Sequence, residues 1–283
     1  MSFIELNISL EMALIYAFVS LGLLISFRII DFSDLTCDGS FVLGSCVCSV
    51  LITNNINPYV SSIAAFLAAA LAGLITGLIN IKFKITDILS GILVAFMLYS
   101  LNLKVMGGMP NISLLNKTTI FDNHNALVLL LLFFIVVFLL LLWLLNSDIG
   151  LALRAVGQNK RLAKNMGVVV SNMVILGLAL SNGLIGLSGA LFSQHQGFSD
   201  ISQGVGTIII GFAGLVIGEK LFNIHSAFAL LLCALLGSII YRLVIGLALH
   251  TDFLGIETQD LNLITGILVI IFMSLPKLGK KSC

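Results

Sequence analysis

Charged residues are scarce in this chain: Asp, Glu, Lys and Arg make up 10% of its 283 residues. A soluble domain has about 25% charged residues and about 45–50% apolar ones, whereas 59% of this chain is hydrophobic. So few charges could not cover the surface of a soluble protein. The net charge of +1 leaves no electrostatic footprint for nucleic acid. We therefore expect an integral membrane protein that contacts the lipid bilayer and no nucleic acid.

Motifs of catalysis and metal binding are also missing. The sequence contains no G-x-x-x-x-G-K-[ST], the loop that wraps nucleotide phosphates. It has no Ser/His/Asp or H-E-x-x-H pattern, and its four histidines share no helical spacing. The five cysteines are odd in number and lie mostly within apolar runs, as small buried side chains do. We expect no enzymatic activity, no cofactor and no metal site.

Long apolar runs dominate what is present. A helix needs about 20 apolar residues to cross a bilayer core of roughly 30 Å, and Ala126–Leu145 has no polar interruption. Continuous runs favour helices over alternating strands. We predict an all-α integral membrane protein, one polytopic domain over residues 1–283, with about nine transmembrane helices, although eight or ten also fit. The segments are Leu10–Ile30, Leu35–Ile52, Tyr59–Ile81, Ile85–Leu101, Ala126–Leu145, Asn172–Phe192, Gly204–Gly218, Phe222–Leu249 and Leu261–Leu275.

Basic residues predict the orientation of these segments. Cytoplasmic loops carry an excess of Lys and Arg. A cytoplasmic C-terminus with nine crossings places eleven of the fourteen basic residues inside, and it leaves Lys104 and Lys117 outside and Arg242 near the outer end of the eighth segment. The outer side collects Glu5, Asp122, Asp200, Asp252, Glu257 and Asp260. The N-terminus is therefore predicted outside, and the first segment is expected to remain as an anchor because no cleavage site follows it.

The third segment carries a stripe of small residues. Ala65, Ala69, Gly73 and Gly77 recur at every fourth position, on one helix face. Such spacing lets helix backbones approach closely where lipid removes the hydrophobic drive for association. We interpret the stripe as packing within the bundle, with a dedicated dimer seam as the alternative.

Residues 148–167 are too polar to cross the membrane. Gly157 and Gly167 are natural breaks, so the segment is predicted to be a short helix, a turn and a second short helix. Leu151, Ala155 and Leu162 form a weak apolar stripe beside four basic residues. From the charge pattern alone, a basic amphipathic helix lying on anionic headgroups fits equally well.

The sequence of this segment resembles a known family. Residues 153–168, LRAVGQNKRLAKNMGV, resemble the cytoplasmic coupling loop of bacterial ABC-transporter permeases of the branched-chain amino-acid and ribose type. Residues 34–44 (DLTCDGSFVLG), 177–191 (GLALSNGLIGLSGAL) and 196–211 (QGFSDISQGVGTIIIG) are more similar still to the tryptophan/tyrosine-type branch of uptake permeases. The similarity runs in order through about residues 10–275.

The resemblance implies a permease subunit of an ATP-driven importer in the bacterial cytoplasmic membrane. ATP hydrolysis would take place on a separate ATPase subunit that docks on the coupling loop. A periplasmic or lipid-anchored binding protein would deliver the substrate, and two copies of the permease would form a homodimer. By the same resemblance, coupling to the ATPase is assigned to Arg154, Gly157, Asn159, Ala163 and Gly167.

Two short stretches of the chain resemble each other. With one inserted residue, Asp34 aligns with Asp200, Thr36 with Ser202, Gly39 with Gly206 and Gly44 with Gly211. In the nine-segment threading they start on opposite faces, as an inverted repeat with broken helices requires. Breaks at Gly39 and Gly204 would free N–H groups for an anion such as a carboxylate. Chance similarity is the alternative explanation.

Polar residues within apolar segments are costly and tend to face a cavity. Each one alone is more typical of a helix–helix hydrogen bond, but as a set they predict a substrate path. The assigned residues are Thr36, Asp38, Gly39, Ser181, Asn182, Gln194 and Gln196, and Ser40 is a further candidate.

Two other function classes remain open. An ion-coupled secondary transporter would need buried carboxylates, and Asp31, Asp34, Asp38 and Asp87 all lie near segment ends. A structural membrane protein would not need the coupling loop for uptake. An amino acid, including an aromatic one, is the substrate that the resemblance favours, whereas nucleosides, sugars and vitamin-like compounds stay open.

Overall fold

The computed structural model describes residues 3–122, 125–221, 226–250 and 261–274. Eleven α-helices, one π-helix and two short strands lie in these ranges. The elements are α1 (Phe3–Leu23), η1 (Leu24–Ile29, π), α2 (Cys37–Thr53), α3 (Pro58–Phe83), α4 (Asp87–Val105), β1 (Asn111–Ser113), α5 (Ala126–Asn146), α6 (Asp148–Gln158), α7 (Lys160–Asn165), α8 (Val170–Gln196), β2 (Phe198–Asp200), α9 (Thr207–Leu221), α10 (Ala227–His250) and α11 (Leu261–Ser274).

Six of the described helices are long and apolar enough to cross a membrane. They are Ile4–Ile29, Pro58–Phe83, Asp87–Val105, Ala126–Asn146, Val170–Gln196 and Ala227–Leu247. The helices α2, α9 and α11 are shorter, with 17, 15 and 14 residues. The protein is thus a multi-pass, all-α membrane protein as predicted, whereas the count of nine crossings stays a prediction. Two predicted segment ends, Phe222 and Leu275, lie outside the described residues, as do Asp252, Glu257, Asp260 and the C-terminal lysines.

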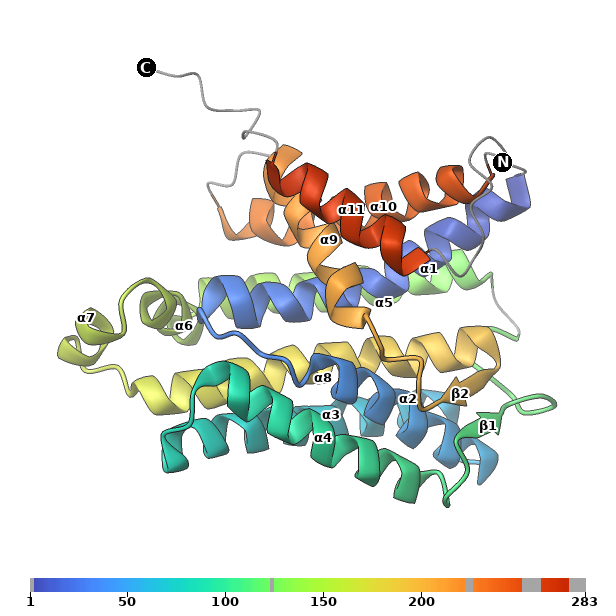
Figure 1. The fold of residues 1–283 in the computed structure, drawn as a ribbon, viewed down its shortest axis with the longest axis horizontal. Coiled ribbons are helices and arrows are strands. Elements are labelled where there is room, and N and C mark those ends of the chain that lie inside the picture. The colour runs from blue at the N-terminus through green and yellow to red at the C-terminus, as the bar shows by residue number, and fades with distance from the viewer. Residues whose placement is uncertain (1–2, 123–124, 222–225, 251–260, 275–283) are drawn as a thin grey trace.

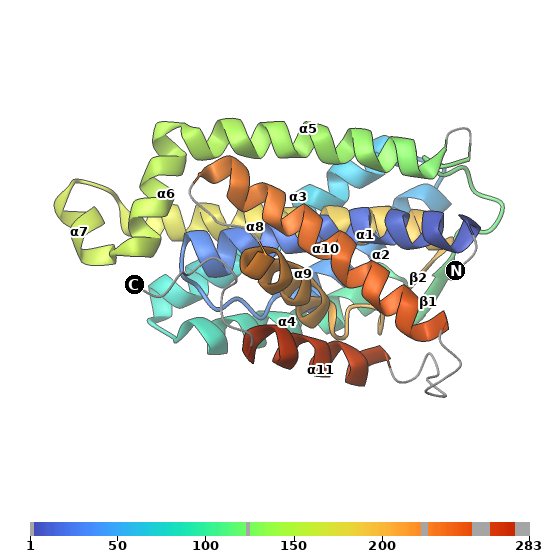
Figure 2. The ribbon, with the colours of Figure 1, turned by 90° about the horizontal axis from the view of Figure 1, so that it is seen from above.

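The long helices run nearly parallel along the long axis of the molecule (Figures 1 and 2). Among the six candidate spans, those of α1 and α8 are the most buried, and α8 packs against α1, α2 and α3. The strands β1 and β2 pair antiparallel at one end, with Ile112 opposite Ser199, whereas α6 and α7 lie at the other end. The helix α9 crosses the direction of the long helices steeply.

Local sequence signals set several helix ends. The Asn57 side chain caps α3 by accepting from the N–H of Tyr59 at 2.9 Å, and Pro58 occupies the first helical position. The Asn125 side chain caps α5 in the same way. Gly197 ends α8 with φ +76°, a left-handed conformation that favours glycine.

The small-residue stripe of α3 packs inside the bundle. Ala65 and Ala69 are fully buried, and a Cβ on Gly73 would lie 2.2 Å from the carbonyl oxygen of Leu178 in α8. The absence of a side chain therefore lets the α3 and α8 backbones touch. The stripe therefore packs within this chain, as interpreted from the sequence.

Candidate functional site

Two helices begin inside the molecule, and their starts meet. After η1 the chain turns back through residues 30–36, and α2 then starts near the centre of the molecule (Figure 1). The helix α9 likewise starts after a non-helical stretch, residues 201–206. The Asp38 carboxylate of α2 accepts hydrogen bonds from the backbone N–H of Ile208 at 2.9 Å and of Gly206 at 3.4 Å. Gly204 lies so close to α2 that its Cβ would sit 2.4 Å from the Asp38 carbonyl oxygen.

The starts of α2 and α9 differ from two predictions made from the sequence. The predicted break at Gly39 is wrong, because α2 begins at Cys37 and Gly39 lies within its first turn, against Leu98 of α4. The N–H groups at the start of α9 are not free for a substrate carboxylate either. The protein's own Asp38 carboxylate occupies that position.

The two similar stretches share a local turn. The Asp34 carboxylate accepts from the N–H of Thr36 at 2.8 Å, and the Asp200 carboxylate accepts from the N–H of Ser202 at 2.7 Å. Both are hydrogen bonds from an Asp to the residue two positions later, which fix a tight turn. Hydrogen bonds from the Ser202 hydroxyl and backbone hold the pKa of Asp200 below its usual value.

Asp34 anchors a buried polar network. Its second oxygen accepts from the Asn182 side-chain amide at 2.6 Å, and the Asn182 carbonyl oxygen accepts from the Ser40 hydroxyl at 2.7 Å. The Thr36 hydroxyl lies 2.9 Å from that of Thr76. All five side chains are buried. Thr36, Ser40 and Asn182 are therefore brought together, and each has a partner within the protein.

The other predicted path residues lie elsewhere. The Ser181 hydroxyl donates to the Gly22 carbonyl oxygen at 2.7 Å, which joins α8 to α1. Gln194 donates to the Ser62 hydroxyl and accepts from the N–H of Ile120, so it fixes the loop before α5. Gln196 is exposed at the end of α8. These three residues do not join the network around Asp34.

A cavity of about 140 Å³ lies beside Asp38. It is bounded by α2, α4 and the non-helical stretch before α9, and Asp38 and Gly39 are the two predicted path residues that line it. Its other lining residues include Tyr99 and Asn102 of α4, which our sequence reasoning missed. The sequence could have indicated them, because they are polar residues three positions apart in an apolar run.

The assigned coupling residues shape the α6–α7 unit, which we define as residues 148–167. The Asn159 side chain caps α7 by accepting from the N–H groups of Arg161 and Leu162 at 3.0 Å. Gly167 ends α7 with φ +87°, and the N–H of Val168 bonds to the carbonyl oxygen of Ala163 at 3.1 Å. Two short helices joined by a turn were predicted, and the structure confirms them. The break between them lies at Asn159 rather than at Gly157, which is within α6.

The inner face of the α6–α7 unit packs against the bundle. A Cβ on Gly157 would lie 1.9 Å from the Ile29 carbonyl oxygen, so α6 touches the last residue of η1. Arg154 donates to the Leu145 carbonyl oxygen at 2.9 Å. The buried positions include Gly150, Leu153, Val156 and Ala163, whereas Leu151 and Leu162 are exposed. Of the predicted apolar stripe, Ala155 is partly buried against the core, whereas the other two members point outward.

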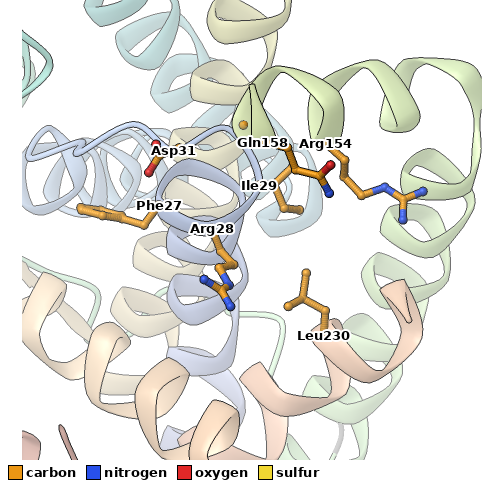
Figure 3. Close-up of a pocket in the computed structure, with 8 residues that line it drawn as sticks. Phe27, Arg28, Ile29, Asp31, Arg154, Gln158 and Leu230 are labelled. Carbon is orange, nitrogen blue, oxygen red and sulfur yellow. The ribbon is translucent and has the colours of Figure 1, made fainter. Parts of the chain in front are cut away.

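Figure 3 shows a pocket of about 470 Å³ between this unit and η1. Its lining includes Arg28 and Asp31, around the end of η1, and Arg154 and Gln158 of α6. Arg28 also forms an ion pair with Glu219 of α9, with 3.1 Å between Nε and Oε1. The end of η1 therefore contacts both the α6–α7 unit and α9.

Comparisons with known proteins identify the family of the chain. A family model described as "Branched-chain amino acid transport system / permease component" matches residues 6–273. The chain is 39% identical over 263 residues to the tyrosine transport system permease protein of Clostridioides difficile (strain R20291), covering 93% of this chain and 88% of that protein. It is 37% identical over 273 residues to an uncharacterized protein of Rickettsia prowazekii (strain Madrid E), covering 94% and 95% of the two chains. No solved structure matches it. The chain belongs to the family of permease components of branched-chain amino acid transport systems.

Proposed function

We propose that this protein is the membrane permease subunit of an ATP-driven importer, with a separate ATPase subunit docked on the α6–α7 unit. The observation that carries the proposal is the shape of that unit. It lies at one end of the molecule (Figure 1), with its inner face packed on the bundle and its outer face exposed. An ATPase docking there would lie on the cytoplasmic side, which agrees with an outside N-terminus and a cytoplasmic C-terminus in the bacterial cytoplasmic membrane.

The exposed side chains of the unit suit a protein partner. Leu162 is 58% exposed and Met166 is 76% exposed, and the exposed basic residues Lys160, Arg161 and Lys164 are their neighbours in the sequence. An apolar centre with a polar rim is the usual anatomy of a protein interface. Arg154, Gly157, Asn159, Ala163 and Gly167 would act by holding this surface in place.

A route for movement runs from this surface into the bundle. A shift of α6 would move Ile29, which touches Gly157. Ile29 is continuous with residues 30–36, where Asp34 binds Asn182 of α8 and precedes α2. Asp38 of α2 then binds the start of α9. ATP-driven closure of the ATPase would therefore reach the starts of both inner helices through direct contacts.

We also propose an inverted repeat and nine membrane crossings. The matching turns at Asp34 and Asp200 support the inverted repeat. Two permease copies would form a homodimer, and a periplasmic or lipid-anchored binding protein would deliver the substrate. The similarity to a tyrosine transport permease favours an aromatic amino acid.

An ion-coupled secondary transporter is the second candidate, because of Asp34. Its carboxylate is fully buried, and the structure pairs it with hydrogen-bond donors and with no basic side chain among the described residues. Buried carboxylates in membranes often carry protons or ions. Uptake that stops with a protonophore and continues without ATP would favour this candidate.

Co-expression with a candidate ABC ATPase subunit from the same organism tests the first proposal. Leu162→Asp combined with Met166→Asp should abolish co-purification of the ATPase and ATP-dependent uptake of labelled L-tyrosine. Met109→Asp is the matched control, because Met109 is 64% exposed and lies just before β1 at the opposite end of the molecule. If the double variant folds and still retains the ATPase, the α6–α7 unit is not the docking surface.

A further inference from the structure

The cavity beside Asp38 has a largely apolar lining that includes two residues with side-chain acceptor oxygens, Asp38 and Asn102. The side-chain nitrogen of Asn102 donates to the Gly39 carbonyl oxygen at 3.2 Å, but its buried oxygen has no partner among the described residues. Asn102 itself is only 1% exposed. A buried, unpaired acceptor is costly unless a donor from outside the protein satisfies it. Asn102 and Asp38 both line this cavity.

The side chains that line the cavity beside Asp38 carry a net negative charge. The lining residues are Asp38, Gly39, Val42, Ala95, Tyr99, Asn102, Ile201, Gly204 and Val205, which include one carboxylate and no Lys, Arg or His. The Asp38 carboxylate receives two backbone N–H bonds and forms no ion pair with the described residues. A second anion would be repelled here, whereas a cationic donor would be attracted.

The wall formed by residues 201–206 indicates contact with water. This stretch leads from β2 to the start of α9 near the centre of the molecule (Figure 1), and Val205 is 74% exposed. Non-helical backbone at membrane depth does not face lipid, because its polar groups would be unpaired there. It lies against protein or lines a water-filled space. The exposed Val205 and the cavity behind it favour the second arrangement.

We propose that the cavity beside Asp38 binds the primary ammonium group of an amino-acid substrate. An ammonium group presents three N–H donors and a positive charge, which match the carboxylate of Asp38 and the free oxygen of Asn102. A divalent metal is a poor match, because such ions prefer several carboxylate ligands. The proposal rests on the proposed transport function. In it, Asp38 binds the positive end of the substrate, whereas the sequence predicted a site for the substrate's carboxylate at this place.

Charge-selective labelling tests the cavity without any transport. Val205→Cys is introduced together with Cys283→Ser, because the four described native cysteines are buried. The protein in lipid vesicles is then treated with a trimethylammonium-ethyl or a sulfonatoethyl methanethiosulfonate. The cationic reagent should react faster, and adding Asp38→Asn should reduce that preference by about tenfold.

The matched control is Met97→Cys on the opposite face of α4. Met97 is 52% exposed but does not line the cavity, so its cysteine should face lipid and react with neither reagent. No reaction at the Val205→Cys position would show that water does not reach the cavity. A cationic preference that is unchanged by Asp38→Asn would show that Asp38 does not set the charge. Either result overturns the proposal.

Ligand binding tests the ammonium group itself. Tyramine, which lacks the carboxylate, should displace labelled L-tyrosine from the permease–ATPase complex without a binding protein, and 3-(4-hydroxyphenyl)propanoate, which lacks the amine, should not. Asn102→Leu should weaken L-tyrosine binding at least fivefold. Equal displacement by both analogues overturns the proposal. Failure of ATP-dependent uptake with intact charge selectivity would instead contradict only the proposed importer function.

Discussion

The Asp38 carboxylate of α2 accepts a hydrogen bond from the backbone N–H of Ile208, 170 residues later in the chain, at a distance of 2.9 Å. One side chain therefore caps a helix to which it does not belong. Because the N–H groups at a helix start have no partner within the helix, this bond stabilises α9 and fixes it to α2 at once. Any movement of α2 would carry the start of α9 with it.

Asp38→Ala should lower the stability of the protein by about 1–2 kcal/mol, as the loss of a helix cap does. Asp38→Asn keeps one acceptor oxygen and should lose less than half of that amount. Thermal unfolding of the two purified variants in detergent compares them directly. Equal unfolding temperatures for Asp38→Ala and the wild type would mean that water replaces the cap at no cost.

Asn182→Ala should be more damaging, because it removes a donor to the buried Asp34 carboxylate and the acceptor of the Ser40 hydroxyl. Breaking a buried charged network costs about 3–5 kcal/mol. The effect should be non-additive with Asp34→Asn, since the neutral side chain needs less compensation. Chemical unfolding of both single variants and the double variant gives the coupling energy. Additive losses would place the two residues in separate interactions.

Gly157→Ala should uncouple ATP hydrolysis from transport, because the added methyl group would collide with the Ile29 carbonyl oxygen. Gly266→Ala in α11 is the control, since nothing lies within 4 Å of its Cβ position. The control should be neutral or stabilise the protein by roughly 0.5–1 kcal/mol, as alanine does in a helix. ATPase activity and uptake are measured on the same complexes. Normal uptake by Gly157→Ala would show that the contact between α6 and η1 does not transmit movement.

Asp200→Asn should destabilise the two-stranded sheet of β1 and β2 at neutral pH. The pKa of Asp200 is held below its usual value by hydrogen bonds from Ser202, so folding favours the ionised form. This stabilisation is present above the unfolded pKa of about 3.9 and is lost as the pH falls through the lower folded value. The difference in unfolding temperature between wild type and variant should therefore be constant from pH 7 to about 5 and shrink below about 4. A difference that already shrinks between pH 7 and 6 would point to another titrating group.

Several features of this protein followed from the sequence because they depend on neighbouring residues. The scarcity of charge predicted a membrane protein, and the apolar runs located the long helices. Gly167 predicted the end of α7, since helix breaks depend on nearby residues. The small residues of α3 predicted a close helix contact, although they did not name α8 as the partner. The motifs around residues 34–44 and 153–168 indicated the family.

Only the tertiary structure decided which distant groups meet. Asp34 and Asn182 are 148 residues apart, and no local pattern shows that one binds the other. The sequence predicted free N–H groups at the start of α9, but it could not show that Asp38 fills that position. It also could not decide which face of α6 and α7 packs inward, because a weak apolar stripe on a short helix does not specify its neighbour. Hydrogen bonds and packing between segments depend on where whole helices lie, and that arrangement is a property of the complete fold.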